Sequence, residues 1–120
     1  MKKILIVEDD PFLVKAYSVK FQKEGIETII AADFQEAEKC MEGEPASAVL
    51  LDLMLPGTSG FDVLATIRKH ATWGKVPVLI LTNLGQESDI ARGKELGAND
   101  YIVKANTKIN DIVAKVKAYL

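Results

Sequence analysis

The chain has 120 residues, of which 48% are hydrophobic and 27% charged, and this predicts one domain over residues 1–120 with its own core. The net charge is −2 and the lysines are scattered along the chain, so no nucleic-acid-binding surface is predicted. The apolar runs are far shorter than the ~20 residues that cross a bilayer, and the single Cys40 allows no internal disulfide. Both features favour a cytoplasmic protein without a membrane span.

Short runs rich in β-branched and apolar residues alternate with longer stretches of helical spacing. The runs predict strands at 4–7, 28–31, 48–51, 78–81 and 101–103. The first helix is predicted to start at Asp10-Pro11, with the acid as N-cap and proline at the first helical position, and to stop at Gly25. The second is predicted from the cap Asp33 to about Glu42.

The remaining three helices follow the later strands. The third is predicted from about Gly60 to His70, the fourth over roughly 87–96, and the last after Thr107 as its cap. Strands that each precede a helix predict a parallel sheet with helices on both faces. We therefore expect an α/β fold of the flavodoxin-like doubly wound (βα)5 type, with its five strands in the order 2-1-3-4-5.

Polar side chains stand where four of the predicted strands end. Glu8 and Asp9 follow the first strand, Asp52 the third, Thr82 the fourth and Lys104 the fifth. Strands 1, 3, 4 and 5 are neighbours in the expected order, and ligands of such folds bind beyond the carboxyl ends of the strands. The five side chains are therefore expected to converge on one small area.

Three carboxylates in that area would repel one another unless a cation or protons compensate. Mg²⁺ fits, because it takes oxygen ligands and completes its octahedron with water and phosphate oxygens. Asp10 precedes Pro11 and is expected to cap the helix rather than bind metal. A carboxylate nucleophile beside a metal, a lysine and a hydroxyl also suits phosphoryl transfer, so Asp52, Lys104 and Thr82 predict that chemistry.

Four segments of the chain resemble the receiver domain of two-component response regulators, and the resemblance extends over essentially the whole length. They are "ILIVEDDP", "VLLDLMLPGTSGFDVL", "VPVLILT" and "ELGANDYIVK". The resemblance implies that Asp52 is the phosphoacceptor and that Mg²⁺ is held by Asp52, by Asp9 directly, by Glu8 through water and by the backbone carbonyl of Met54.

The resemblance also implies a switch. Thr82 matches the family's switch hydroxyl, Lys104 its phosphoryl-binding lysine and Tyr101 its rotating aromatic residue. The implied donor is a sensor histidine kinase or a phosphotransfer protein. The implied output is a downstream protein, or a second copy of the chain, at the face formed by the fourth helix, the fifth strand and the fifth helix. Such a domain catalyses only its own phosphoryl transfer and dephosphorylation.

The chain departs from the family pattern in three ways. Ala105 follows the lysine where the family usually has a proline in a cis peptide, and a trans bond is expected here. The stretch between Lys104 and the last helix is one residue longer than usual. Asn83 follows Thr82 where a smaller alanine or glycine is common, and is expected to restrict access to the phosphoryl site.

The sequence leaves three other functions open. A flavodoxin-like nucleotide- or flavin-binding module would need a phosphate-cradling glycine loop after the first strand, where "EDDPFL" stands. An aspartyl-phosphate hydrolase usually carries a second acid two residues after its nucleophile, where this chain has Met54. A pseudo-receiver would bind its partner without phosphorylation. Ala105, in place of the usual proline, keeps this alternative open.

Overall fold

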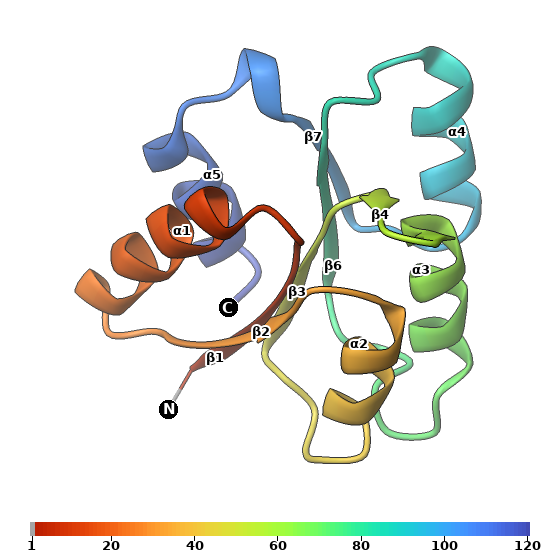
Figure 1. Cartoon of the computed structure of the whole chain (residues 1–120), viewed down its shortest axis with the longest axis horizontal. Coiled ribbons are helices and arrows are strands. Elements are labelled where there is room, and N and C mark those ends of the chain that lie inside the picture. The colour runs from red at the N-terminus through yellow and green to blue at the C-terminus, as the bar shows by residue number, and fades with distance from the viewer. Residues whose placement is uncertain (1) are drawn as a thin grey trace.

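The computed structural model describes residues 2–120, and a parallel sheet of five strands runs through its centre (Figure 1). The sheet consists of β1 (Lys3–Val7), β2 (Glu27–Ala31), β3 (Ala48–Leu51), β6 (Val78–Thr82) and β7 (Asp100–Val103). Their order is β2-β1-β3-β6-β7, and all four neighbouring pairs are parallel. The predicted order 2-1-3-4-5 is confirmed when these five strands are counted along the chain.

Helices cover both faces of the sheet, as the alternating pattern predicted. In Figure 1, α1 (Pro11–Lys23) and α5 (Ile109–Lys117) lie on one side of the sheet. On the other side lie α2 (Phe34–Cys40), α3 (Gly60–Lys69) and α4 (Glu87–Glu95). Within residues 2–120, no helix has both the length and the apolar character that would let it cross a membrane.

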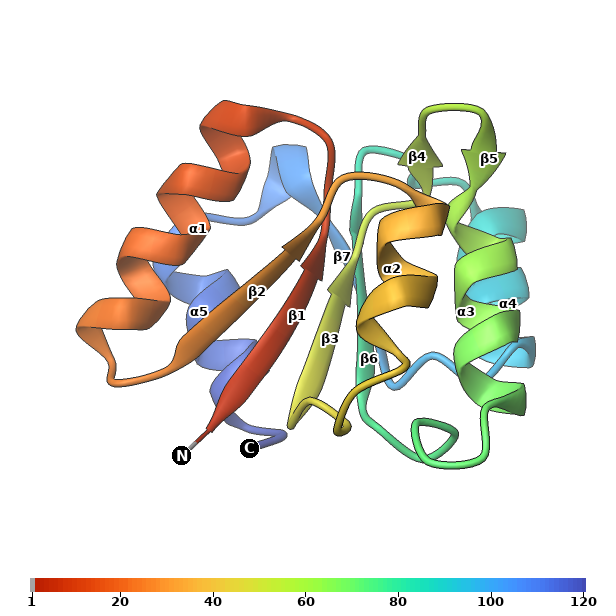
Figure 2. The same ribbon diagram turned by 60° about the horizontal axis from the view of Figure 1, so that its bottom comes forward.

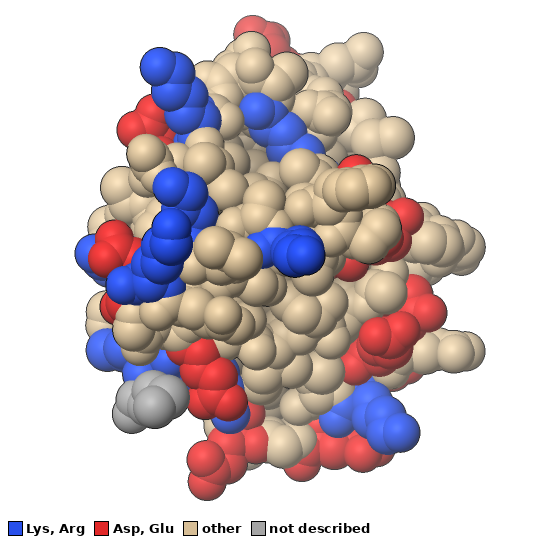
Figure 3. Space-filling model, turned by 60° about the vertical axis from the view of Figure 1, so that its left-hand side comes forward, with Lys and Arg blue, Asp and Glu red and all other residues tan. Residues whose placement is uncertain are grey.

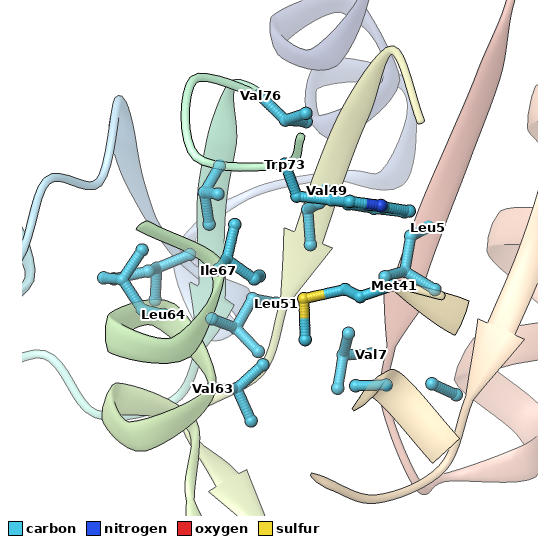
Figure 4. Close-up of a cluster of buried hydrophobic side chains, with 14 of the residues drawn as sticks. Leu5, Val7, Met41, Val49, Leu51, Val63, Leu64, Ile67, Trp73 and Val76 are labelled. Atoms are coloured by element: carbon cyan, nitrogen blue, oxygen red, sulfur yellow. The ribbon is translucent and has the colours of Figure 1, made fainter. Parts of the chain in front are cut away.

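The core divides into two clusters, because successive side chains of a strand point to opposite faces. On β1, Leu5 and Val7 belong to the cluster under α2 and α3, whereas Ile4 and Ile6 belong to the cluster under α1 and α5. Figure 4 shows the first cluster, where a row of side chains from α3 packs against β3. That row consists of Val63, Leu64 and Ile67. Central strands buried on both faces explain the continuous apolar runs of the sequence.

The predicted helix starts are confirmed for the first three helices. The Asp10 carboxylate accepts the amide N–H groups of Phe12 and Leu13, and the Asp33 carboxylate accepts that of Glu36. The hydroxyl of Ser59 accepts the Phe61 amide and so caps α3, which begins at Gly60. Local side-chain acceptors at N-caps satisfy amides that have no partner inside the helix, so they can be recognised from sequence.

Two expectations differ from the structure. The second helix ends at Cys40 rather than near Glu42. Thr107 does not cap the last helix: Lys108 occupies the N-cap position of α5, and the Thr107 hydroxyl donates to the Val103 carbonyl 3.1 Å away. Lys108 separates Thr107 from the first residue of the helix, and the Thr107 hydroxyl lies at the end of β7.

An antiparallel hairpin that was not predicted follows β3. Its strands are β4 (Met54–Leu55) and β5 (Thr58–Ser59), and Gly57 between them has a φ of 69°, which suits glycine. Figure 2 shows the hairpin beyond the arrowheads of β1, β2 and β3, at the carboxyl edge of the sheet. The hairpin therefore forms part of the rim on which the predicted site residues stand.

Gly60 lies where the hairpin returns against the end of β3. A Cβ atom at this position would stand 2.3 Å from the Asp52 carbonyl oxygen and 2.5 Å from the Leu53 Cα, so backbone would have to move. We expect Gly60→Ala to lower the free energy of unfolding by at least about 2 kcal/mol, measured by urea denaturation. Gly43→Ala is the matched control, because its Cβ would meet only the Cys40 carbonyl, at 3.6 Å. Equal losses in the two variants would contradict this packing.

Candidate phosphoryl-transfer site

Three carboxylates converge at the carboxyl edge of the sheet, as the strand order predicted. Glu8 and Asp9 follow β1 and Asp52 follows β3, and each offers an oxygen within 4.8 Å of the others. Glu8 is only 3% exposed and Asp52 6%, whereas Asp9 is exposed. Asp10 is occupied with the start of α1, as predicted, through hydrogen bonds of 2.9 and 3.4 Å to its Oδ1.

Backbone pairing fixes the two buried acids. The Glu8 amide donates to the Ala31 carbonyl and the Asp52 amide to the Val7 carbonyl, so both residues continue the ladder of the sheet. Oε2 of Glu8 accepts the amide N–H groups of Asp9 and Asp10, at 3.0 and 3.3 Å. These contacts fix the orientation of the Glu8 carboxylate within the site.

Lys104 supplies the positive charge of the site. Its Nζ donates to Oδ2 of Asp52 at 2.9 Å and to Oε1 of Glu8. Burial by itself lowers the pKa of Lys104, but the hydrogen bonds to Glu8 and Asp52, with the charges of these two acids, outweigh burial and raise this pKa above its ordinary value. The ammonium is therefore charged and held between the two buried carboxylates.

Glu8 is the acid whose protonation is most altered. The pKa of Glu8 is raised from 4.5 to about 7, chiefly because the group is buried; the hydrogen bond from Lys104 opposes this rise and the nearby Asp52 charge adds to it. One ammonium is insufficient for two buried carboxylates and Asp9 beside them. The site thus has an affinity for further positive charge, which a proton on Glu8 or a cation can satisfy.

The donor set fits a magnesium ion, because its protein donors are oxygens and carboxylates are the ligands this ion prefers. Oδ1 of Asp52 accepts the Met54 amide at 3.1 Å, which leads the chain from the acid into β4. The Met54 side chain is 57% exposed and packs in neither cluster. Met54 therefore contacts the site through its backbone.

Within residues 2–120, Thr82 and Tyr101 make no hydrogen bond to the three acids, but they are linked to each other by a residue that the sequence did not single out. Thr82 is the last residue of β6 and is fully buried, and its Oγ1 accepts the Leu84 amide at 3.4 Å. The Tyr101 hydroxyl donates to the Leu84 carbonyl at 2.5 Å. Leu84 therefore connects them through its backbone, which no side-chain pattern reveals.

Tyr101 is half-buried against α4. A Cβ on Gly93 of this helix would stand 3.3 Å from the tyrosine ring, so the absence of a side chain there lets the ring approach. Burial, and then the charges of Asp89 and Asp52, raise the pKa of Tyr101 to about 12. The phenol therefore stays protonated and keeps its hydrogen bond at neutral pH.

The family model of the response regulator receiver domain matches residues 4–117. This chain belongs to that family. Receiver domains accept phosphoryl groups in two-component signalling, and the chain is therefore a phosphoaccepting signalling domain.

The receiver domain is similar to parts of longer regulators. It is 38% identical to the sensory transduction protein RegX3 of Mycolicibacterium smegmatis, over 100% of this chain and 51% of that protein. It is 36% identical to the DNA-binding response regulator MtrA of the same species, over 99% of this chain and 50% of that protein. The chain thus spans about half the length of these relatives.

A solved receiver domain adds information about the site. The receiver domain of sensor histidine kinase PA1611 from Pseudomonas aeruginosa PAO1 matches with a TM-score of 0.87 and 25% identity, over 98% of this chain and 96% of that one. Its crystal structure holds a magnesium ion coordinated in the active site cleft. Receiver domains thus bind Mg²⁺ in a cleft of this fold, and the acid cluster of the present chain matches that chemistry.

The raised pKa of Glu8 predicts a pH dependence of stability without Mg²⁺. The folded state holds this proton more tightly than the unfolded chain, so the stabilisation is complete below pH 4.5 and is lost as pH rises through about 7. Between pH 4.5 and 8, the free energy of unfolding of the wild type should fall by roughly 2–3 kcal/mol relative to Glu8→Gln. Urea denaturation with a chelator present measures this, and parallel pH profiles would contradict it.

Proposed function

We propose that Asp52 is the phosphoacceptor of this receiver domain. The observation that carries the proposal is the buried Asp52 carboxylate, which pairs with the Lys104 ammonium at 2.9 Å inside a cluster of three acids. The proposed donor is a phosphohistidine of a sensor histidine kinase or of a phosphotransfer protein. An Asp52 oxygen forms the new O–P bond, the P–N bond breaks, and the leaving imidazole takes up a proton.

The other side chains stabilise charge during this transfer. Lys104 already donates to Asp52 and needs little movement to follow the phosphoryl oxygens as negative charge spreads over them. Mg²⁺, held by Glu8, Asp9, Asp52 and the Met54 carbonyl, supplies further positive charge to the same oxygens when bound. The domain catalyses its own transfer and its own dephosphorylation, and no other reaction is proposed for it.

The same residues support a switch. The Thr82 hydroxyl turns to the phosphoryl group and gives up its 3.4 Å contact with the Leu84 amide. The Leu84 carbonyl holds the Tyr101 hydroxyl, so this change reaches the tyrosine ring that packs on α4. A local electrostatic event thereby biases the surface formed by α4, β7 and α5. A downstream protein or a second copy of the chain reads this surface.

No contact with nucleic acid or membrane is proposed for this chain, and its location in the cytoplasm stays a prediction. On the face that Figure 3 shows, basic side chains lie among acidic and uncharged ones rather than in one continuous patch. The rival functions, a pseudo-receiver or a flavodoxin-like binding module, require that Asp52 stay unmodified. They therefore become outcomes of the labelling experiment.

Phosphorylation of Asp52 can be tested with acetyl phosphate. We expect the wild type to gain the mass of one phosphoryl group in the presence of Mg²⁺, and to gain none when the metal is chelated. Asp52→Asn should abolish labelling, because an amide oxygen is a poor nucleophile. Intact-protein mass spectrometry measures both.

The matched control is Asp62→Asn, which alters an exposed aspartate in the first turn of α3. It should label as the wild type does. Stoichiometric labelling of Asp52→Asn would disprove the assignment, and failure of the wild type to label would favour a pseudo-receiver.

The output surface can be mapped with beryllofluoride, which mimics the phosphoryl group. With Mg²⁺ present, amide chemical shifts should change at the site and along α4, β7 and α5, while those of α2 stay unchanged. In Asp52→Asn the shifts should stay at their unmodified values. Sedimentation then separates the two outputs, because doubled mass indicates a dimer and monomer mass indicates a downstream protein. Changes confined to the acid cluster would contradict the proposed surface.

A further inference from the structure

Lys104 stands in a loop rather than in a strand, although the site depends on where its ammonium lies. β7 ends at Val103, and Lys104–Asn106 form a 3₁₀ turn before α5. Ala105 and Asn106 are exposed, so core packing does not fix this turn. Its backbone must be held in another way if Nζ is to reach two carboxylates at once.

Two side chains hold the backbone on either side of Lys104. Before the lysine, the Val103 carbonyl accepts the Thr107 hydroxyl at 3.1 Å. After it, the Ala105 amide donates to Oδ1 of Asn83 at 3.1 Å. The Thr107 amide also donates to the Lys104 carbonyl, at 3.3 Å, which closes the turn. The loop is therefore fastened to the end of β7 on one side and to the segment after β6 on the other.

The structure brings Asn83 and Ala105 into contact through the hydrogen bond of 3.1 Å from the Ala105 amide to the Asn83 Oδ1. A proline at position 105 would have no N–H to give Asn83, and it would disfavour the helical backbone that Lys104 adopts in the turn. The Lys104–Ala105 bond is trans, as every peptide bond is among the described residues. With alanine, an amide becomes available, and the asparagine accepts it.

We propose that Asn83 is a positioning residue for Lys104, an inference that rests on the function proposed above. Its amide oxygen contacts the backbone of Ala105 and not the reacting groups, so it acts through the turn. Released from Asn83, the turn moves outward, and a displacement of about 1 Å takes the bond between Lys104 and Asp52 beyond hydrogen-bonding distance. Thr107 plays the same part on the other side of the lysine.

The first test uses the unphosphorylated protein and is independent of phosphoryl transfer. In Asn83→Ala, the Ala105 amide should exchange with solvent faster, and the ¹⁵N-detected signal of the Lys104 ammonium should weaken as its ion pairs open. Asn110→Ala is the matched control, because this exposed asparagine lies on α5. It should change neither signal. An unchanged Ala105 amide in Asn83→Ala would overturn the proposal.

The second test measures the initial rate of labelling by acetyl phosphate with Mg²⁺. Asn83→Ala should slow labelling by about threefold to tenfold, the range expected for the loss of one hydrogen bond. Thr107→Val should slow it as well, and Thr107→Ser, which keeps the hydroxyl, should restore it. In a Lys104→Ala background, Asn83→Ala should have no further effect, since there is no ammonium left to position.

The outcomes separate this inference from the proposed function. If Asn83→Ala changes the rate by the same factor with and without Lys104, or accelerates labelling by opening access, Asn83 acts at the phosphoryl site itself and the inference fails. If the wild type takes no label, the proposed function fails, and the amide and ammonium signals alone decide whether Asn83 positions the lysine.

Discussion

The site depends on one electrostatic constraint, which is that two buried carboxylates share a single ammonium. Glu8 and Asp52 are buried, and a buried charge destabilises the fold unless it is paired and hydrogen-bonded. Lys104 satisfies one oxygen of each acid, and backbone amides satisfy others. Asp9 adds a third negative charge, so the pairing remains incomplete. The incomplete pairing gives the site an affinity for further positive charge, which the proposed magnesium ion would supply.

The topology of the doubly wound sheet brings these groups together. Each parallel strand delivers its last residue to the same edge, and the order of the strands makes the ends of β1, β3 and β6 neighbours. The close approach of Gly60 to the Asp52 carbonyl folds the β4–β5 hairpin back beside the acids. Thr82 lies at the same edge, and the Leu84 backbone joins it to Tyr101, so the site and the proposed output surface share one short segment of backbone.

The loop of Lys104 illustrates how one geometric requirement can be met by different residues. A proline restricts a loop by fixing its own backbone angle, whereas an alanine leaves an N–H that needs a partner. Here the partner is Asn83, whose place after Thr82 puts it within reach because β6 and β7 are neighbours. Two residues that look unrelated in the sequence therefore belong to one contact across the edge of the sheet.

The sequence by itself determined the strands, their order, the caps Asp10 and Asp33, and the convergence of Glu8, Asp9, Asp52 and Lys104, because periodicity, capping and parallel topology are local or follow from simple rules. It did not reveal the β4–β5 hairpin, whose strands have two residues each, or the turn of Thr107 back to Val103. It also gave no sign of the backbone link at Leu84. Only the tertiary structure decided these features and the raised pKa of Glu8, because each arises from atoms distant in the chain that meet after the sheet has formed.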